Sequence, residues 1–451
     1  MSARPVIVIG NPESNRVGFL QAALEGLGRS PAAIVSWREV LAPLPNPSPE
    51  EKSYPSSLPR RFPSRREGLE DSDRNRSQSH SPPSLRDQSS QGQSSGCILV
   101  PNGCAFGTRL EGWGGTSGRG TCEPIIRIES PGKDFGVERA LLMLGADTVD
   151  GGDSPAARLS KDECASLSED KGRILYPRQW YHGFCAALNR VEAELADAPA
   201  HTLMNAPGDI AVMFDKRLCH ARLEAAGIPV PGRLGPVRSY NELVSRMREA
   251  RWSRVFVKLA HGSSASGVVA FQSSETRCQA TTTVEMVDDP SEPMGLRLYN
   301  SRRIRTYTDT GRIARLIDAL CVHGVHVEQW LPKAGLDGHT LDLRVVVIAG
   351  EARHIVVRMS KSPITNLHLL NRRGDPDAVR LRMGEDAWRA AMETCERTMQ
   401  CFPDSLYAGI DLLITADFKR HAVLEVNAFG DLLPGILSDG QDTYMAELLK
   451  A

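Results

Sequence analysis

One stretch of the sequence constrains the fold most: two apolar, β-branched runs lie on either side of a polar turn. The stretch comprises residues 409–427, with the turn at 416–420. This pattern predicts a β-hairpin. Because successive side chains on a strand point to opposite faces, Glu425 and Asn427 share one face. If the two ends of the turn pair with each other, Asp411 lies opposite Glu425 and joins that face.

The predicted face brings two carboxylates and an amide oxygen together among Ile, Leu and Val residues. Unpaired charges on such a surface are costly, so they favour a bound cation. Magnesium prefers carboxylate oxygens combined with the phosphates of a substrate. An edge hairpin whose acidic residues face solvent fits the same pattern. The stretch therefore predicts a magnesium site at Asp411, Glu425 and Asn427. A solvent-exposed hairpin without a metal is the alternative.

Composition narrows the class of protein. The chain has 451 residues, enough for two or three domains, and its net charge of -1 provides no general attraction for nucleic acid or acidic membranes. The first residues lack the apolar run of a signal peptide, and no run is long enough to span a bilayer. The ten cysteines are scattered, without a Cys-x-x-Cys pair. We therefore expect a cytoplasmic protein with neither nucleic-acid nor membrane partners.

The N-terminal part shows an alternating pattern. Residues 6–11 form a short apolar run, a helical pattern follows and stops at Gly28, and residues 33–37 form a second apolar run. Strand, helix and strand in this order predict a parallel α/β sheet. The pattern resumes at residue 125, with helices expected at 134–144 and 179–195. We expect one α/β domain formed by residues 1–42 and 123–205.

Residues 43–122 differ in character, since Pro, Ser, Arg, Gln and Gly dominate. Such a composition buries too little apolar surface to offset the entropy lost on ordering. The segment is predicted to be a disordered insertion in the first domain. An arginine-rich contact arm and an error of gene prediction are the two alternatives.

Turn residues at 204–209 predict a boundary after the first domain. Asp215 is placed to cap a helix that runs to Ala226, and Lys216 is its first side chain after the cap. A final helix is expected at 443–450.

Lys258 stands alone among apolar residues in the predicted strand 254–259. A lysine in a buried run needs an anionic partner. The strand leads into a Gly- and Ser-rich loop, 261–267, whose N–H groups and hydroxyls can surround phosphate oxygens. The loop returns into a strand, which excludes the strand–loop–helix phosphate loop. A mobile hairpin tip is the alternative interpretation of the loop.

Further polar residues occur on predicted strands. A strand at 325–332 precedes Asp342 and Arg344, which share one strand face. Arg358 ends the returning strand and is expected to reach the same face.

The order of these motifs resembles the ATP-grasp superfamily, especially its glutathione synthetase-like and ribosomal-protein glutamate ligase-like branch. The resemblance covers about residues 204–436. It implies an α/β pre-ATP-grasp domain followed by an α+β ATP-grasp fold of two subdomains. The small subdomain would be 206–330, with a Gly/Ser lid loop, and the large subdomain 331–451, with the magnesium site.

The resemblance also implies roles for residues that match the motifs. Contacts to ATP phosphates are implied for Lys216 and Lys258, with a loop closing over them that contains Gly262, Ser263, Ser264 and Gly267. The adenine-binding hinge would be Glu328, Gln329, Trp330 and Leu331, with Asp342 near the ribose. Catalytic contacts to the transferred phosphate or the substrate carboxylate are implied for Arg344, Arg358 and Lys258. Magnesium would be held by Asp411, Glu425 and Asn427.

The implied activity is that of an ATP- and magnesium-dependent ligase, which joins a carboxylate to an amine (or thiol) through an acyl phosphate and forms ADP. Both substrates would be small molecules or peptides, and a homodimer is compatible with the resemblance. A phosphotransferase on the same scaffold and a nucleotide-binding protein without catalysis are the alternatives. The sequence departs from the family after Asn427, in residues 428–435, and in the loop at Asn366. These departures leave the identity of the second substrate, the acceptor of the acyl group, undetermined. For Asp431, binding of an amine, binding of a metal and capping of its loop are the alternatives.

Overall fold

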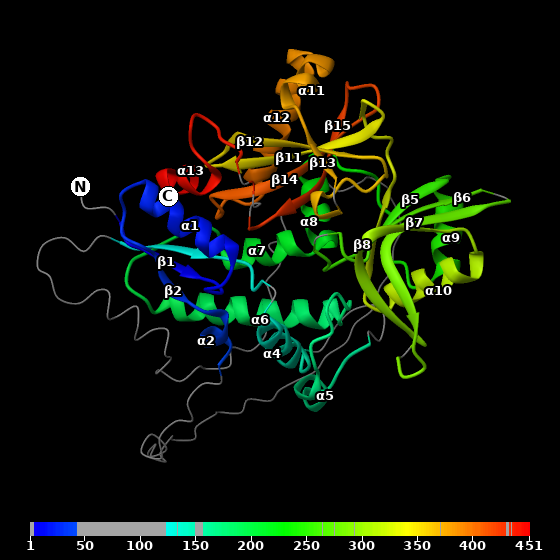
Figure 1. Cartoon of the computed structure of the whole chain (residues 1–451), viewed down its shortest axis with the longest axis horizontal. Helices are drawn as coiled ribbons and strands as arrows, with labels where there is room; N and C mark the ends of the chain where they lie inside the picture. Colours follow the sequence, from blue (N-terminus) through cyan, green and yellow to red (C-terminus); the bar gives the residue numbers. More distant parts are fainter. Residues whose placement is uncertain are drawn as a thin grey trace, which may run out of the picture. The chain divides into compact units, whose positions relative to one another are not determined.

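A computed structural model describes residues 4–42, 123–132, 134–148, 157–263, 265–274, 276–292, 294–369, 371–429, 433 and 435–451 (Figure 1). The predicted insertion 43–122, Ser264 and Asp431 lie outside the described residues, so the predictions about them stay predictions. No helix among the described residues is both long and apolar enough to cross a membrane.

The N-terminal part contains a four-stranded parallel sheet in the order β2-β1-β3-β4, so the predicted parallel pairing is confirmed. Its strands are β1 Val6–Ile9, β2 Ala33–Val35, β3 Ile125–Ile128 and β4 Thr202–Leu203. The helices of this part are α1 Asn15–Gly26, α2 Trp37–Leu41, α4 Phe135–Gly145, α5 Lys161–Ser166 and α6 Pro177–Ala196. Placing Trp37 at the end of a strand was wrong, because Ser36 and Glu39 form a capping box that starts α2 there.

A five-stranded antiparallel sheet follows, in the order β8-β7-β6-β5-β9. Its strands are β5 Arg254–Leu259, β6 Val269–Ser273, β7 Cys278–Asp288, β8 Leu296–Tyr307 and β9 Val325–Gln329. Helices α9 Tyr240–Glu249 and α10 Thr310–Cys321 share a core with this sheet, in which Leu243 and Leu316 are fully buried with Val255 and Val257. The Gly/Ser loop joins β5 to β6, as predicted from the sequence.

The remaining chain forms a six-stranded sheet in the order β13-β12-β11-β14-β15, with β10 paired to β11. Its strands are β10 Gly335–Leu336, β11 His339–Ile348, β12 Glu351–Ser360, β13 Arg372–Gly374, β14 Tyr407–Ile414 and β15 His421–Asn427. The accompanying helices are α11 Pro376–Met383, α12 Glu385–Gln400, the short 3-10 helix η2 Leu367–Leu369, and α13 Thr443–Lys450. Helix α13 has the bounds that its sequence predicts, and it packs against α1 (Figure 1).

Two helices connect the N-terminal part to the five-stranded sheet: α7 Pro207–Phe214 and α8 Lys216–Ala225. The prediction of a turn through residues 204–209 was wrong from Pro207 onward, because Pro207 opens α7 at a position where proline costs the helix no hydrogen bond. Both helices contact β15 of the six-stranded sheet. The division into subdomains at residue 206 stays a prediction.

In the hairpin of β14 and β15, the pairing near the turn is shifted by one residue from the predicted register, and a bulge further along β15 cancels this shift. The N–H of Thr415 donates to the carbonyl of Arg420, so the turn is one residue away from the pairing expected from the sequence. A bulge then leaves Leu424 without a direct partner, between the pairs 412–423 and 411–425. The bulge restores the expected pairing, and Asp411 lies opposite Glu425 as predicted.

Candidate functional site

A cleft of about 720 Å³ is lined by β5, β9, β11, β12, β14, β15 and the start of α8. It brings together most of the site residues expected from the sequence. Those that line it are Lys216, Lys258, Gly262, Ser263, Glu328, Gln329, Leu331, Asp342, Arg344, Arg358, Asp411, Glu425 and Asn427.

Lys216 enters the cleft from the first turn of α8. Asp215 caps this helix by accepting hydrogen bonds from the N–H groups of Arg217 and Leu218, at 2.8 and 3.3 Å. The Lys216 ammonium donates to the carbonyl oxygen of Gly262 at 2.6 Å and lies 2.7 Å from Glu425 Oε1. One ammonium therefore connects the Gly/Ser loop to the carboxylate on β15.

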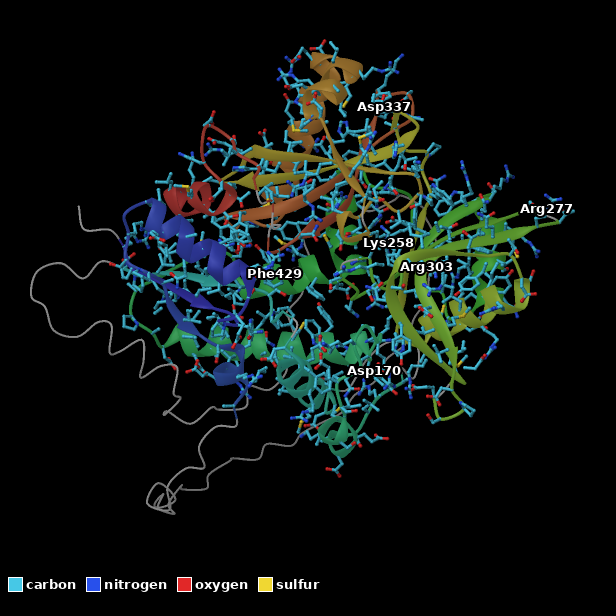
Figure 2. All side chains as sticks on the ribbon, in the orientation of Figure 1. Asp170, Lys258, Arg277, Arg303, Asp337 and Phe429 are labelled. Atoms are coloured by element: carbon cyan, nitrogen blue, oxygen red, sulfur yellow. The ribbon has the colours of Figure 1, made fainter. Side chains whose placement is uncertain are left out.

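Lys258 projects from β5 (Figure 2) and forms an ion pair with Glu328 on the adjacent strand β9. The side chains are 13% and 2% exposed. Burial alone would raise the pKa of Glu328, but Lys258 and the nearby His326, whose Nε2 lies 3.6 Å from Glu328 Oε2, lower this pKa to about 2. The anionic partner that a buried lysine requires is thus a protein carboxylate in this structure. The Glu328 carboxylate faces Lys258, while its backbone belongs to the segment expected to read adenine.

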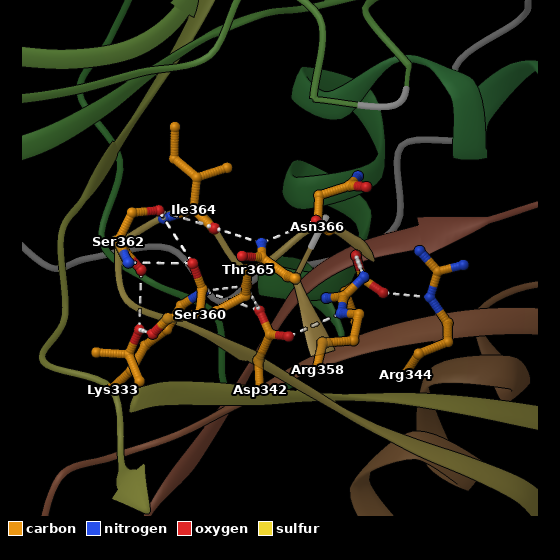
Figure 3. A network of polar contacts seen from close by, with 12 residues as sticks. Lys333, Asp342, Arg344, Arg358, Ser360, Ser362, Ile364, Thr365 and Asn366 are labelled. Carbon is orange, nitrogen blue, oxygen red and sulfur yellow. Dashed lines mark hydrogen bonds and ion pairs between the residues drawn. The ribbon is translucent and has the colours of Figure 1, made fainter. Parts of the chain in front are cut away.

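The two arginines share one carboxylate on the six-stranded sheet (Figure 3). Arg344 donates from Nε to Asp411 Oδ1, and Arg358 donates from Nη1 to Asp411 Oδ2 at 3.0 Å. Arg358 also donates from Nε to Asp342 Oδ1 at 2.7 Å. Burial would lower the pKa of Arg358, but Asp342 and Asp411 raise it, so the guanidinium stays charged.

Lys333 belongs to the same network and was missed in the sequence. Its ammonium lies 2.8 Å from Asp342 Oδ2 and 2.8 Å from Thr365 Oγ1 (Figure 3). Asp342 is 1% exposed, and both of its oxygens are engaged by protein side chains. No local pattern marks Lys333, because its partners lie on β11 and in a loop about 30 residues later in the chain.

The predicted magnesium ligands form the remaining wall of the cleft. Asn427 donates from Nδ2 to the carbonyl of Gly409 at 3.0 Å, which leaves its Oδ1 as an acceptor. Burial would raise the pKa of Glu425, but Lys216, Lys258 and Arg344 lower it, so the side chain is a carboxylate. Among the described residues no three His, Cys, Asp or Glu side chains are grouped to hold a metal. Each oxygen of Asp411 accepts one arginine hydrogen bond and keeps a second lone pair. Two carboxylates and one amide oxygen therefore still fit magnesium, which completes its shell with water and substrate phosphates.

Two of the expected nucleotide contacts do not line the cleft. Gly267 has φ of +67°, and a Cβ there would lie 2.3 Å from Leu259 Cδ1, so the residue shapes the loop. The Trp330 ring packs beside Phe256, with ring centroids 5.3 Å apart. Any contact of Trp330 with adenine would therefore come from its backbone.

The cleft continues beyond Asn427 toward the N-terminal sheet. Arg16, Phe19 and Trp180 line this end, and Arg16 donates to the carbonyl of Phe429 at 2.5 Å. No sequence pattern marks these residues as part of the cleft, since they lie hundreds of positions from the hairpin. This end provides space next to the predicted phosphate region.

No protein-family model and no curated protein matches the chain. Solved structures do match it. One is "ATP-grasp ligase PsnB complexed with phosphomimetic variant of minimal precursor, Mg, and ADP", 15% identical, with 100% of this chain and 99% of that chain covered and a TM-score of 0.42. Another is "macrocyclase MdnC bound with precursor peptide MdnA from Microcystis aeruginosa MRC", 12% identical, with 98% of each chain covered and a TM-score of 0.46.

A third match is "D-cycloserine synthetase DcsG", 13% identical, with 99% of this chain and 98% of that chain covered and a TM-score of 0.45. Solved structures of ATP-grasp ligases are thus similar to this chain over nearly its whole length. Because these identities and TM-scores are low, the function is inferred from the side chains of the cleft.

Proposed function

We propose that this chain is an ATP- and magnesium-dependent ligase that joins a carboxylate to an amine through an acyl phosphate. One observation supports the proposal most: lysines and arginines from four different elements line one cleft of about 720 Å³ together with two carboxylates and an amide oxygen, and three of these cations form direct ion pairs with the two carboxylates. A pocket for a triphosphate needs cationic groups and metal ligands around the same space.

The charges of the cleft explain why a divalent cation would be required. At the centre of the cleft, the ion pairs described above join five cationic side chains to four carboxylates, leaving a single net positive charge there. Arg16, Arg173, Arg373 and Glu138 also line the cleft but are not among these pairs. The cations are Lys216, Lys258, Lys333, Arg344 and Arg358, and the carboxylates are Glu328, Asp342, Asp411 and Glu425. A triphosphate carries several negative charges, which one positive charge cannot balance. Magnesium at Asp411, Glu425 and Asn427 would neutralise the β- and γ-phosphates and draw electrons from the bond that breaks.

The chain's own residues would bind and orient the nucleotide. Lys216 and Lys258 would hold the phosphates together with N–H groups of the loop 262–267. The segment from Glu328 to Leu331 would read the edge of adenine through its backbone. Asp342 was expected near the ribose, but its engaged oxygens support a different role, which is to orient Arg358 and Lys333.

The chemistry then needs no nucleophilic side chain. An oxygen of the substrate carboxylate attacks the γ-phosphorus, the bond to ADP breaks, and an acyl phosphate forms. Arg344 and Arg358, held by Asp411, would stabilise the charge that spreads over the transferred oxygens. The amine then attacks the acyl carbon, phosphate leaves, and the amine proton passes to solvent or to the departing phosphate.

The test is incubation of the protein with ATP, magnesium and paired pools of carboxylates and amines, including small molecules and peptides. ADP formation that requires both pools, together with a new amide detected by mass spectrometry, is expected. A stable phosphorylated product without an amide would indicate a phosphotransferase. Tight ATP binding without turnover in every pool would indicate a nucleotide-binding protein, and either result would overturn the ligase proposal.

A further inference from the structure

His261 is the first residue of the Gly/Ser loop, two residues after the end of β5, and the mechanism above does not use it. The side chain is 1% exposed, and the residue contributes to the wall of the cleft. Its Nε2 lies 2.8 Å from Asp215 Oδ2, and its ring stacks on Tyr181, with ring centroids 4.0 Å apart and an interplanar angle of 11°. A buried imidazole held on two sides has one fixed orientation.

The contact of His261 with Asp215 is the middle one of three that join the start of α8 to the base of the loop. The N–H of Lys216 donates to the carbonyl of Ala260 at 3.0 Å. The ammonium of Lys216 donates to the carbonyl of Gly262 at 2.6 Å. The cap and the first residue of α8 are thus bonded to three consecutive residues at the base of the loop. Both segments carry groups that the proposed function assigns to the phosphates of ATP.

The chemistry of the pair fixes which atom donates. Burial would raise the pKa of Asp215, but His261 and Arg217 lower it, so Asp215 is a carboxylate that accepts. Burial lowers the pKa of His261 to about 4 although Asp215 opposes this, so the ring is neutral at neutral pH, with its hydrogen on Nε2. Its Nδ1 then has a lone pair, for which the described residues provide no hydrogen bond. The ring therefore acts as a hydrogen-bond donor of fixed direction.

We infer that His261 is a positioning residue for the nucleotide phosphates. Through Asp215 it holds the base of the Gly/Ser loop against the first turn of α8, so that the Lys216 ammonium and the loop backbone meet the same triphosphate. This inference rests on the proposed function, because it requires ATP in the cleft. A residue that only stabilises the fold would affect all ligands alike. A positioning residue for phosphates affects ATP and leaves adenosine unchanged.

Two variants of His261 separate its hydrogen bond from its ring. His261→Phe keeps a ring for the stack on Tyr181 and removes the donor, whereas His261→Gln removes the ring and keeps an N–H near the position of Nε2. Binding of magnesium–ATP and of adenosine is measured by calorimetry, and folding by circular dichroism. The Phe variant is expected to bind ATP about tenfold or more weakly, since the lost hydrogen bond has a charged acceptor. Its adenosine affinity is expected to stay within about twofold of wild type, and the Gln variant to bind ATP more tightly than the Phe variant.

The outcomes separate this inference from the proposed function. Wild-type protein that binds no magnesium–ATP overturns the proposed function, and the inference with it. Wild-type protein that binds ATP, with a Phe variant that binds it equally well, overturns the inference alone. An equal loss of ATP and adenosine affinity also overturns it, because the role is then structural. If the Phe variant does not fold, His261→Asn, whose shorter amide does not reach Asp215, takes its place with the same expectations.

Discussion

The role of Lys258 can be tested because the structure gives it two competing explanations. It either binds the phosphates of ATP or serves only to neutralise Glu328, with which it forms a buried ion pair. Lys258→Met alone cannot distinguish them, because it leaves the Glu328 carboxylate buried without its main partner. The double variant Lys258→Met/Glu328→Gln removes both charges and keeps both side chains similar in volume. Glu328→Gln alone is the matched control.

The magnitude follows from the environment of Glu328. Its pKa falls from an ordinary value near 4.5 to about 2, which at about 1.4 kcal/mol per pH unit is about 3 kcal/mol of stability. Because the folded-state pKa is lowered, this stability is present above about pH 4.5 and is lost as the pH falls through 2. Removing one partner of a buried pair costs about 3–5 kcal/mol, which agrees with that estimate. Lys258→Met should therefore lose about 3 kcal/mol at pH 7.5, and the double variant should recover most of it.

The assay combines urea unfolding, followed by tryptophan fluorescence, with ADP formation under the conditions that support wild-type turnover. If Lys258 binds phosphate, the double variant regains stability while its turnover stays about 100-fold or more below wild type. Glu328→Gln alone should keep turnover within about tenfold of wild type, because Lys258 remains in the cleft. Turnover of the double variant close to that of the Glu328→Gln control would refute a role of Lys258 in phosphate binding.

Three further variants probe carboxylates: two in the cleft, and Glu447 on α13, which forms a buried ion pair with Arg127. Glu425→Ala should abolish ADP formation, whereas Asp417→Ala, in the exposed turn of the same hairpin, should leave ADP formation unchanged in the same assay. Asp342→Asn should lower the free energy of unfolding by about 3 kcal/mol or more, measured in urea, because two buried cations lose a carboxylate. The exposed control Asp337→Asn should change the free energy of unfolding by less than about 0.5 kcal/mol. An equal effect of the two variants would contradict a stabilising role of Asp342 in neutralising buried cations. Burial raises the pKa of Glu447 to about 7, so its favourable contribution is present below about pH 4.5 and is lost as the pH rises through 7. The urea concentration at the midpoint of unfolding should therefore fall less between pH 5 and 8 in Glu447→Gln than in wild type. An equal fall in both proteins would refute the explanation that the buried carboxyl group of Glu447 causes this pH dependence.

The sequence predicts elements whose signals are local. Asp215 identifies the start of α8, because a capping side chain and the helix that it caps are adjacent in the chain. The hairpin at 409–427 follows from two apolar runs around a polar turn, and the turn pairing assumed from the sequence places Asp411 opposite Glu425, where the structure has it. The register within the turn was wrong by one residue. A bulge at Leu424 cannot be read from the apolar pattern, since a leucine there fits a regular strand equally well.

The partners of the charged residues could not be predicted in the same way. The sequence shows that Lys258 needs an anion, but the choice of Glu328 depends on β9 lying beside β5, which follows only from the sheet order. Lys333 and Arg16 have no pattern of their own, because their partners lie at distant positions in the chain. Residues that act through long-range ion pairs are therefore identified from the structure, and those that act from strand faces or helix caps from the sequence.

The ion pairs of the cleft imply that metal and nucleotide bind cooperatively. Lys216 now has Glu425 as a partner at 2.7 Å, so a triphosphate must compete with this carboxylate for the ammonium. A divalent cation on Glu425 would neutralise the competing carboxylate and free Lys216 for phosphate. By thermodynamic linkage, magnesium then raises the affinity for ATP by the factor by which ATP raises the affinity for magnesium. Glu425→Gln weakens the competition without a metal, so it should bind metal-free ATP at least as tightly as wild type and lose most of the stimulation by magnesium. Calorimetric titration of ATP with and without magnesium measures both effects, and equal stimulation in the two proteins would show that the cation does not bind Glu425.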